Sequence, residues 1–365
     1  MSNKIEYNDL FAFHPGYYIS EIIDDMEITQ AEFAKRMGTT EKTLSKLVNG
    51  HINLSNDLAK NLSTMLGSSV GVWLNLQQKY DEKLIEIKER ESLDEQGKIM
   101  KMIDYSYFKN NIGLPPAKNM SEKIKNLCAC LMISDLRILT QQDFLVNYRT
   151  GIKNVQEKNI VNSQAWLQIA LNCAKQMNVD SFDANKLKGF LPEIRSMTLQ
   201  EPNQFIPRLR EIFSGCGVAF VLLPHLKNSG INGAVKWFGN NQVVLALNDR
   251  RCNADTFWFS LFHEIKHVLQ QKVTKVFISG NNDDFSDMDN QLEEDADAFA
   301  SNYLIPLNEY EKWHPNKYVT DEEIVSFAKK IGIHPGVVAG RLQYDGVIPQ
   351  NRCSKLKVKY HIVMR

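Results

Sequence analysis

The sequence predicts an α+β protein that is mainly helical, with its strands confined to the second half of the chain. Short apolar-periodic segments bounded by cap residues fill residues 1–80, and amphipathic helical periodicity returns from Ser121 to about Leu199. Strand-like runs of β-branched and apolar residues begin only after Pro207. These three observations indicate a helical front, a helical middle and an α+β second half.

The composition excludes several classes of protein. The 365 residues include 43 Lys or Arg and 43 Asp or Glu, and this balance argues against a protein whose whole surface grips nucleic acid. The 6 cysteines are scattered and form no CxxC pair, which favours reduced thiols over a disulfide framework or a thiolate metal site. The first residues lack a signal-peptide pattern, and no apolar run approaches the roughly 20 residues of a membrane helix. We expect a soluble cytoplasmic protein with no membrane partner.

Charged residues, helix-breaking residues and the alternation of apolar with polar residues predict the elements that follow the front segment. The segment Tyr80–Lys101 is highly charged and contains no proline, which predicts a solvated connecting helix. The Asn, Gly and paired Pro residues of Lys109–Asn119 break the helical pattern. A Gly-Asn-Asn turn joins two strands into a hairpin. The strands that we expect are, in order, Gly217–Pro224, Gly233–Phe238, Gln242–Leu247 and the tail Lys355–Met364.

The front segment contains the start and stop signals of two consecutive short helices. Thr29 and Glu32 have the spacing of a capping box, and the helix that follows stops at Gly38. Thr40 is placed to cap a second helix, which ends at Asn49-Gly50. Two capped helices across a glycine-containing turn predict a helix-turn-helix.

In a helix-turn-helix the N-terminal part of the second helix enters the major groove of DNA. The residues that we expect to face a double-stranded DNA operator are Gln30, Thr39, Thr40, Glu41, Lys42, Thr43, Ser45 and Lys46, with Gln30 near a phosphate. Residues 1–80 hold 7 Lys or Arg and 9 Asp or Glu, a net charge of −2. Since phosphate neutralisation dominates DNA affinity, we expect weak binding per monomer and a homodimer on DNA. The alternative is a helical bundle used only for protein contacts.

Two local signatures make the front segment similar to a known family. The segment begins with His14-Pro15-Gly16 and ends with Trp73-Leu74-Asn75-Leu76-Gln77. With the helix-turn-helix between them, they resemble the HigA-type antitoxins, a branch of the Xre/Cro repressors, over about residues 10–80. The resemblance implies a lambda-repressor-like all-α bundle and a role in transcription regulation or toxin–antitoxin control.

A second motif, His263-Glu264-Ile265-Lys266-His267, has the HExxH pattern. On a helix the two histidines lie four residues apart on one face, where they can bind one Zn²⁺. Glu264 lies about 100° round the same helix, where a general base is wanted. The flanking residues are strongly apolar, and three ionisable groups on a buried helix require partners, which a metal ion supplies for two of them.

A catalytic zinc site needs a third protein ligand, and the downstream segment Leu292–Pro306 offers acids at helical spacing. Glu293 borders the apolar stripe of this helix and is placed to be that ligand. Asp297, one turn on, can hydrogen-bond the distal nitrogen of a liganding histidine. Glu294 and Asp295 are the competing acids, which we expect to face solvent. Taken without HExxH, the acids indicate only a charged helix start favoured by the macrodipole.

HExxH followed by this acidic helix resembles the ImmA/IrrE family of metallopeptidases (the DUF955 group). Further matches lie near Tyr148 (YRTG) and Trp166 (AWLQIA), in NGAVKWF and WFSLFHE, and in GIHPGVVAGRLQYDG near the C-terminus. They cover roughly residues 145–350. The resemblance implies a gluzincin-like fold, with a small sheet on the metal-bearing helix. It implies His263, His267 and Glu293 as zinc ligands and Glu264 as the base that activates water.

In such folds an edge strand beside the active-site helix holds the substrate backbone. We expect this strand to comprise Gly233, Ala234, Val235, Lys236 and Trp237. The acidic loop Gly280–Gln291 lacks the glycine of an EF-hand and is expected to form a mobile rim of the cleft, not a calcium site. Tyr303 and His225 are candidates for stabilising the oxyanion, and a structural role is the alternative for each.

The sequence therefore predicts a fusion of a DNA-binding regulator with a zinc-dependent endopeptidase that cleaves a repressor, an antitoxin or itself. One alternative is a non-proteolytic repressor or antitoxin whose peptidase-like domain senses a signal or binds a partner. A further one is a structural module that binds a cognate toxin. The domains that we expect are a helix-turn-helix domain at 1–80, a connecting helix and linker at 81–120, a helical middle at 121–205, a metallopeptidase domain at 206–312 and a helical and strand extension at 313–365.

Overall fold

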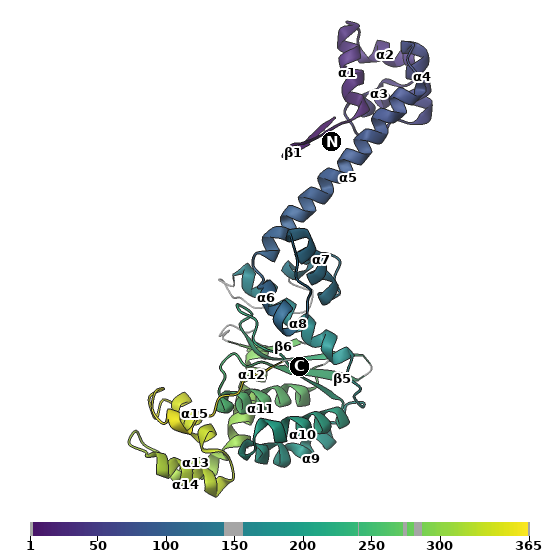
Figure 1. Cartoon of the computed structure of the whole chain (residues 1–365). Coiled ribbons are helices and arrows are strands. Elements are labelled where there is room, and N and C mark those ends of the chain that lie inside the picture. Colours follow the sequence, from purple (N-terminus) through teal and green to yellow (C-terminus); the bar gives the residue numbers. More distant parts are fainter. Residues whose placement is uncertain (1–2, 142–155, 240, 273–275, 281–286, 364–365) are drawn as a thin grey trace. The chain divides into compact units, whose positions relative to one another are not determined.

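The computed structural model describes residues 3–141, 156–239, 241–272, 276–280 and 287–363. Within it the chain forms two compact units, Met1–Gln96 and Gly97–Arg365. Both are rich in helices (Figure 1). Each is built around its own hydrophobic core. None of the described helices combines the length and apolar character that a membrane span requires.

The first unit is a helical bundle preceded by a two-stranded ribbon. The ribbon pairs β1(Lys4–Tyr7) with β2(Leu10–Phe13) in antiparallel register, an element that the sequence analysis missed. Its apolar side packs on Tyr80 and Ile87 of the long last helix. The helices are α1(Pro15–Asp25), α2(Gln30–Met37), α3(Glu41–Val48), α4(Asn56–Leu66) and α5(Val70–Met100).

Helix boundaries in this bundle follow the cap residues. Thr29 and Thr40 accept backbone N–H bonds at the starts of α2 and α3, and Gly38 ends α2 in the left-handed conformation. The capping box at Thr29 is only half formed, because the Glu32 carboxylate accepts a bond from Arg36 instead of reaching back to the cap. Fully buried Phe33, Ile19, Leu44, Leu47 and Leu62 fill the core.

Helices of the second unit enclose a four-stranded sheet. The helices before the sheet are α6(Tyr105–Asn111), α7(Met120–Leu131), α8(Glu157–Lys175), α9(Ala184–Ser196) and α10(Pro202–Gly215), with the 3-10 turns η1(Leu136–Thr140) and η2(Met197–Leu199). The strands are β3(Val218–Leu222), β4(Ile231–Phe238), β5(Gln242–Leu247) and β6(Val276–Gly280). The later helices are α11(Ala254–Gln270), α12(Asp287–Leu304), α13(Leu307–Trp313), α14(Asp321–Ile331) and α15(Pro335–Tyr344), with η3(Ser354–Leu356).

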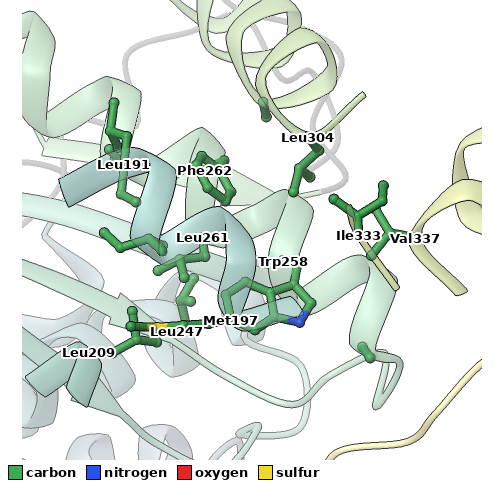
Figure 2. Packing of buried hydrophobic residues seen from close by; sticks show 14 of the residues in the cluster. Leu191, Met197, Leu209, Leu247, Trp258, Leu261, Phe262, Leu304, Ile333 and Val337 are labelled. Atoms are coloured by element: carbon green, nitrogen blue, oxygen red, sulfur yellow. The ribbon is translucent and has the colours of Figure 1, made fainter. Parts of the chain in front are cut away.

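The strand order is β3-β5-β4-β6, with β3 parallel to β5 and β4 antiparallel to both of its neighbours. Helices α8 and α11 cover opposite faces of this sheet (Figure 1). Alternate residues Val243, Leu245 and Leu247 of β5 join the core beneath α11, whereas Val244 and Ala246 point the other way. Burial of both faces explains why β3 and β5 are continuous apolar runs. In the core shared with α11, Trp258, Leu261 and Phe262 are fully buried (Figure 2).

Three expectations about this half of the chain are wrong or fall wholly or partly outside the described residues. The tail does not form a strand, because η3 occupies 354–356 and Lys359 makes only a single bridge, with Asn253. Helix α12 begins at Asp287, so the last residues of the expected acidic loop are helical, whereas 281–286 lie outside the described residues. The YRTG motif also lies outside them, within 142–155.

Candidate metal centre and candidate nucleic-acid interface

Helix α11 has one apolar face that fixes it in the core and one face that bears the HExxH residues. Trp258, Leu261, Phe262, Ile265 and Val268 are fully buried beneath the sheet. On the other face, His263, Glu264 and His267 retain at most 5% of their surface exposed. Because burial of unpaired polar groups is costly, these side chains require partners, and the neighbouring helix α12 supplies Glu293 and Asp297 to the two histidines.

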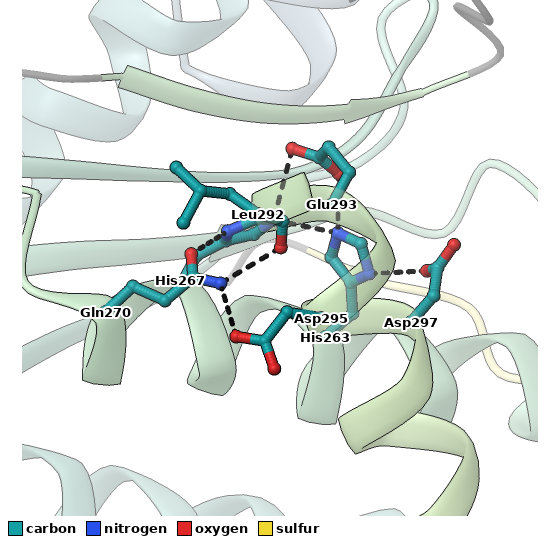
Figure 3. A network of polar contacts seen from close by, with 7 residues as sticks. All are labelled: His263, His267, Gln270, Leu292, Glu293, Asp295 and Asp297. Atoms are coloured by element: carbon teal, nitrogen blue, oxygen red, sulfur yellow. Dashed lines mark hydrogen bonds and ion pairs between the residues drawn. The ribbon is translucent and has the colours of Figure 1, made fainter. Parts of the chain in front are cut away.

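The three expected metal ligands meet at one point between α11 and α12 (Figure 3). The Nε2 atoms of His263 and His267 lie 2.9 Å apart. The carboxylate of Glu293 lies 3.2 Å from the first of these nitrogens and 3.3 Å from the second. The sequence separation of 26 to 30 residues is closed entirely by the packing of the two helices.

Two further residues hold the histidine rings by their other nitrogens. His263 Nδ1–H donates to Asp297 Oδ1 at 2.8 Å, and His267 Nδ1–H donates to Gln270 Oε1 at 2.9 Å. Since a carboxylate and an amide oxygen can only accept, both rings turn the Nε2 lone pair toward Glu293. This is how outer partners set the tautomer of metal-binding histidines.

This donor set fits a tetrahedral metal ion. Two imidazole lone pairs and a carboxylate at these short separations repel one another unless a proton or a cation lies among them. Zn–N and Zn–O bonds of about 2.0–2.1 Å would place tetrahedral ligand atoms about 3.3 Å apart. The two Nε2 atoms are 2.9 Å apart, and Glu293 approaches His263 through Oε2 at 3.2 Å and His267 through Oε1 at 3.3 Å, so all three side chains come within reach of one ion. With these three as the protein ligands, a fourth position would stay open, as in catalytic sites.

Without a metal ion, a proton takes the place of the cation. Burial opposes the charged form of His263, but its hydrogen bonds to Asp297 and Glu293 outweigh this effect and raise its pKa to about 10. Burial likewise opposes the ionised form of Glu293, yet its bonds to His263 and His267 lower its pKa to about 2. The site therefore holds positive charge next to an ionised carboxylate, and a metal ion would displace the proton.

Glu264 lies directly under strand β4. A β carbon at Gly233 would lie 2.4 Å from Glu264 Oε1 and 2.8 Å from Leu247 Cδ2. The strand also carries a register irregularity between Ile231 and Gly233. A glycine inside a strand commonly marks such a close approach, and here it makes room for the carboxylate beside the metal ligands.

Strand β4 is not the sheet edge that we expected for Gly233–Trp237. It pairs with β5 on one side and β6 on the other, so its backbone groups are already bonded within the sheet. Among the described strands, β6 forms the edge on this side. Phe277 of β6 stacks on the His267 ring, with the ring centres 4.2 Å apart. The predicted hairpin is confirmed, because β4 pairs antiparallel with β5. The other side of β4, which we expected to be free, is paired with β6.

The remaining candidates lie around the site without joining it. Glu294 and Asp295 are exposed, and Asp295 accepts bonds from Lys266 and Gln270. The Tyr303 ring packs against Phe262, which belongs to the core face of α11.

His225, the other oxyanion candidate, lies in the loop after β3. Its backbone N–H donates to Asp249. Burial, followed by the charge of Arg250, lowers the pKa of its side chain. Neither His225 nor Tyr303 belongs to the group of metal-ligating atoms.

Sequence reasoning missed two residues of the site. Gln270 follows His267 by three residues and therefore lies on the same helix face, a spacing that could have identified it. It also donates to the carbonyl of Leu292 and to Asp295, which ties α11 to α12 (Figure 3). Phe277 gave no local signal, since it approaches His267 only through the folding of β6.

In the first unit, α3 presents the polar residues that we expected at its start. Glu41, Lys42 and Lys46 are exposed, while Leu44 and Leu47 on the opposite side are fully buried. Thr39, Thr43, Ser45 and Gln30 are half-buried and Thr40 is exposed. The Thr40 and Thr43 hydroxyls bond each other at 2.8 Å, so Thr40 serves as the cap in addition to any contact it makes.

The charge on α2 and α3 differs from the average of the segment. These two helices carry Lys35, Arg36, Lys42 and Lys46 against the two acids Glu32 and Glu41. Glu32 is itself neutralised by Arg36, with 2.9 Å between the charged atoms. The helices are therefore locally basic although residues 1–80 have a net charge of −2.

Comparisons with known families match two separate segments of the chain. Residues 19–73 match the family described as Helix-turn-helix, and residues 225–343 match the IrrE N-terminal-like domain, a peptidase family of the M78 type. The first match contains α2 and α3, and the second contains the HExxH helix and Glu293.

Two similar proteins each match less than a fifth of the chain. An uncharacterized HTH-type transcriptional regulator of Escherichia coli, YddM, is 40% identical over 63 residues, which are 17% of this chain and 67% of that protein. Virulence-associated protein A′ of Dichelobacter nodosus is 38% identical over 69 residues, 19% of this chain and 60% of its own.

Two solved structures also match part of the chain. A candidate antidote protein of a plasmid maintenance system from Nostoc punctiforme is 34% identical, with a TM-score of 0.22, over 23% of this chain and 92% of its own. A HigA-family addiction module antidote protein from Coxiella burnetii is 25% identical, with a TM-score of 0.21, over 23% of this chain and 91% of its own.

Proposed function

Because the chain belongs to the helix-turn-helix transcriptional regulators through its front domain and also carries an IrrE N-terminal-like domain, we propose that it couples operator binding to zinc-dependent proteolysis. The protein would act in the cytoplasm, where its operator lies. Its peptidase domain would cleave a repressor, an antitoxin or this chain itself.

The observation that carries the peptidase proposal is the meeting of His263, His267 and Glu293 beside buried Glu264. A bound zinc ion would supply Lewis acidity, polarising a peptide carbonyl and lowering the pKa of water. Asp297 and Gln270 hold the two imidazoles by Nδ1, so that their Nε2 atoms would be the ones to bind the ion. The Glu264 carboxylate, which lies against Gly233, would take the proton of the attacking water and pass it to the leaving amine.

The substrate backbone would add to the sheet at β6 rather than at β4. A peptide in extended conformation pairs with an exposed strand edge, and β6 is the edge strand that contacts the metal-bearing helix through Phe277 and His267. This position replaces our sequence-based assignment to Gly233–Trp237.

Metal analysis of the purified full chain tests the peptidase proposal. We expect about one zinc per chain in the wild type and in Glu264→Gln, and loss of zinc in His263→Ala, because only the last variant removes a ligand. Partner proteins incubated with the wild type should be cut, and Glu264→Gln should leave them intact. Absence of zinc from a wild-type protein supplied with the ion would refute the proposal. Zinc without cleavage would favour a sensor that binds a partner.

The DNA-binding proposal depends on the exposed start of α3. We expect a homodimer to place two copies of this helix about 34–36 Å apart in successive major grooves. Lys42→Ala combined with Lys46→Ala should weaken operator binding and reduce the slope of log affinity against log salt by about two, because two phosphate contacts are lost. Glu82→Gln, on the exposed surface of α5, is a control outside the recognition helix. Unchanged operator affinity in the double variant would exclude α3 as the recognition helix.

A further inference from the structure

A cavity of about 500 Å³ opens beside the first turns of α11. Its walls come from α10, from the ends of β3 and β5, and from the segment Lys359–Val363 near the end of the chain. That segment is held in place by backbone bonds, from Tyr360 N–H to Cys252 O and from Ala254 N–H to Val358 O, each 2.8 Å long. The ion pair between Lys357 and Asp255 adds a third attachment, at 2.8 Å.

The cavity lies on the metal-bearing face of α11. Thr256 and Ser260 line it, and with His263 and His267 they follow the spacing i, i+4, i+7, i+11, which describes one stripe of a helix. Asn232, another lining residue, directly precedes the glycine that contacts Glu264. The cavity therefore lies along the same stripe of α11 as the two histidines, nearer the start of that helix, although neither histidine lines it.

Charged groups in the lining are mostly basic. Arg210, Arg250, Arg251 and Lys359 contribute cations, against the single acid Asp249. That carboxylate already accepts two backbone N–H bonds, from His225 and Ile362, each at 2.9 Å. Arg250 donates to the carbonyl of Gly230 at 2.7 Å and is thereby held at the cavity wall. The net positive lining favours a ligand with a carboxylate.

One lining atom also favours a peptide over a simple anion. Asn232 Oδ1 is buried and has no hydrogen-bond partner among the described residues. An acceptor of this kind is satisfied by an N–H donor, and a peptide backbone supplies such donors together with an acidic side chain. Thr256 and Ser260 add hydroxyl groups along the same path.

The helix geometry sets the distance of this cavity from the reacting bond. Thr256 precedes His263 by seven residues, a rise of about 10 Å at about 1.5 Å per residue. An extended peptide spans about 3.3 Å per residue, so the same distance corresponds to about three residues of substrate. We propose that the cavity is a substrate subsite that binds an acidic side chain about three residues from the scissile bond. This inference rests on the proposed peptidase function.

Binding of labelled peptides to the full chain tests the subsite without requiring cleavage. The probes are fluorescein-labelled hexaglutamate and hexaglutamine, followed by fluorescence anisotropy. We expect hexaglutamate to bind at least tenfold more tightly, and Arg210→Gln with Arg251→Gln to weaken it about tenfold, because charge-assisted contacts are lost. Arg210→Lys with Arg251→Lys should retain most of the affinity, which separates loss of charge from loss of folding.

Arg208 provides the matched control on the same helix. It pairs with Glu193 and Glu211 outside the cavity. Arg208→Gln therefore removes one positive charge, as Arg210→Gln does, without touching the lining. We expect this variant to bind hexaglutamate like the wild type. Equal binding of the two probes, or equal losses in Arg208→Gln and Arg210→Gln, would overturn the inference.

Cleavage of a mixed peptide library by the zinc-loaded protein separates this inference from the function on which it rests. Enrichment of Glu or Asp about three residues from the cut, reduced in the Arg210→Gln, Arg251→Gln variant, would support both. Cleavage without such enrichment would overturn the subsite and leave the peptidase function standing. Selective hexaglutamate binding with no cleavage of any peptide would retain the anion-binding cavity and refute the peptidase function.

Discussion

Replacing Gly233 by alanine should move the carboxylate of Glu264, the proposed general base, without removing a proposed metal ligand. The added β carbon would lie 2.4 Å from Glu264 Oε1, whereas an ordinary contact begins at 3.4 Å. The carboxylate must therefore retreat by about 1 Å, and misplacement of this size can cost about a hundredfold in rate. Leu247 Cδ2, at 2.8 Å from the same position, limits the movement of the strand itself.

The same overpacking should destabilise the second unit by about 1–3 kcal/mol. We expect Gly233→Ala to bind zinc like the wild type, since the contact does not involve His263, His267 or Glu293. Its rate of peptide cleavage should fall about a hundredfold. Metal content, urea unfolding and cleavage kinetics measure the three quantities separately.

Gly189→Ala is the matched control. Gly189 lies in α9, and a β carbon there would meet nothing within 4 Å. We expect this variant to be as stable as the wild type or slightly more so, because alanine is the better helix former. Wild-type cleavage rate in Gly233→Ala would refute the placement of Glu264 as the base. Wild-type stability would refute the tight contact itself.

Three further predictions concern the metal centre and the front bundle. Asp297→Asn should weaken zinc binding by about 10- to 100-fold, because the ring of His263 loses its anionic partner. Competition with a chelator measures this affinity, and the exposed control Glu294→Gln should leave it unchanged. Since the raised pKa of about 10 keeps His263 protonated in the metal-free protein, zinc affinity should rise about tenfold per pH unit from pH 7 to 9, and a plateau above pH 7.5 would contradict this. The stability of the metal-free protein should change with pH in the opposite direction. The stabilisation that His263 contributes is complete below its usual pKa and is lost as pH rises toward 10. Gly16→Ala would place a β carbon 2.1 Å from the backbone oxygen of Leu47, so the front bundle should lose about 3 kcal/mol in a thermal melt, whereas Gly71→Ala, with its nearest contact at 3.8 Å, should melt like the wild type.

Local signals in the sequence predicted much of the secondary structure. The caps Thr29 and Thr40 and the left-handed Gly38 lie where the sequence analysis placed them, because each acts on backbone groups within a few residues. The strands near Gly217–Pro224, Gly233–Phe238 and Gln242–Leu247 are also observed, since their apolar runs and turn residues are local properties.

Errors arose where a partner came from a distant segment. The ribbon β1–β2 is short, and packing on Tyr80 and Ile87 accounts for its stability, which no short window of sequence reveals. The tail alternates like a strand, yet Lys359 makes a single bridge with Asn253 and no further ladder. Alternation describes a half-buried segment, but pairing requires an available edge.

What the sequence by itself determined is the chemistry available to this protein. HExxH places two imidazoles and a carboxylate on one helix because the helical repeat is fixed by backbone geometry. Tertiary structure alone decided how that chemistry is assembled. It brought Glu293 to 3.2 Å from His263, inserted β4 between β5 and β6, and formed a basic cavity on the stripe of α11 that carries the two histidines. These outcomes depend on packing free energy summed over remote segments, which a local pattern does not encode.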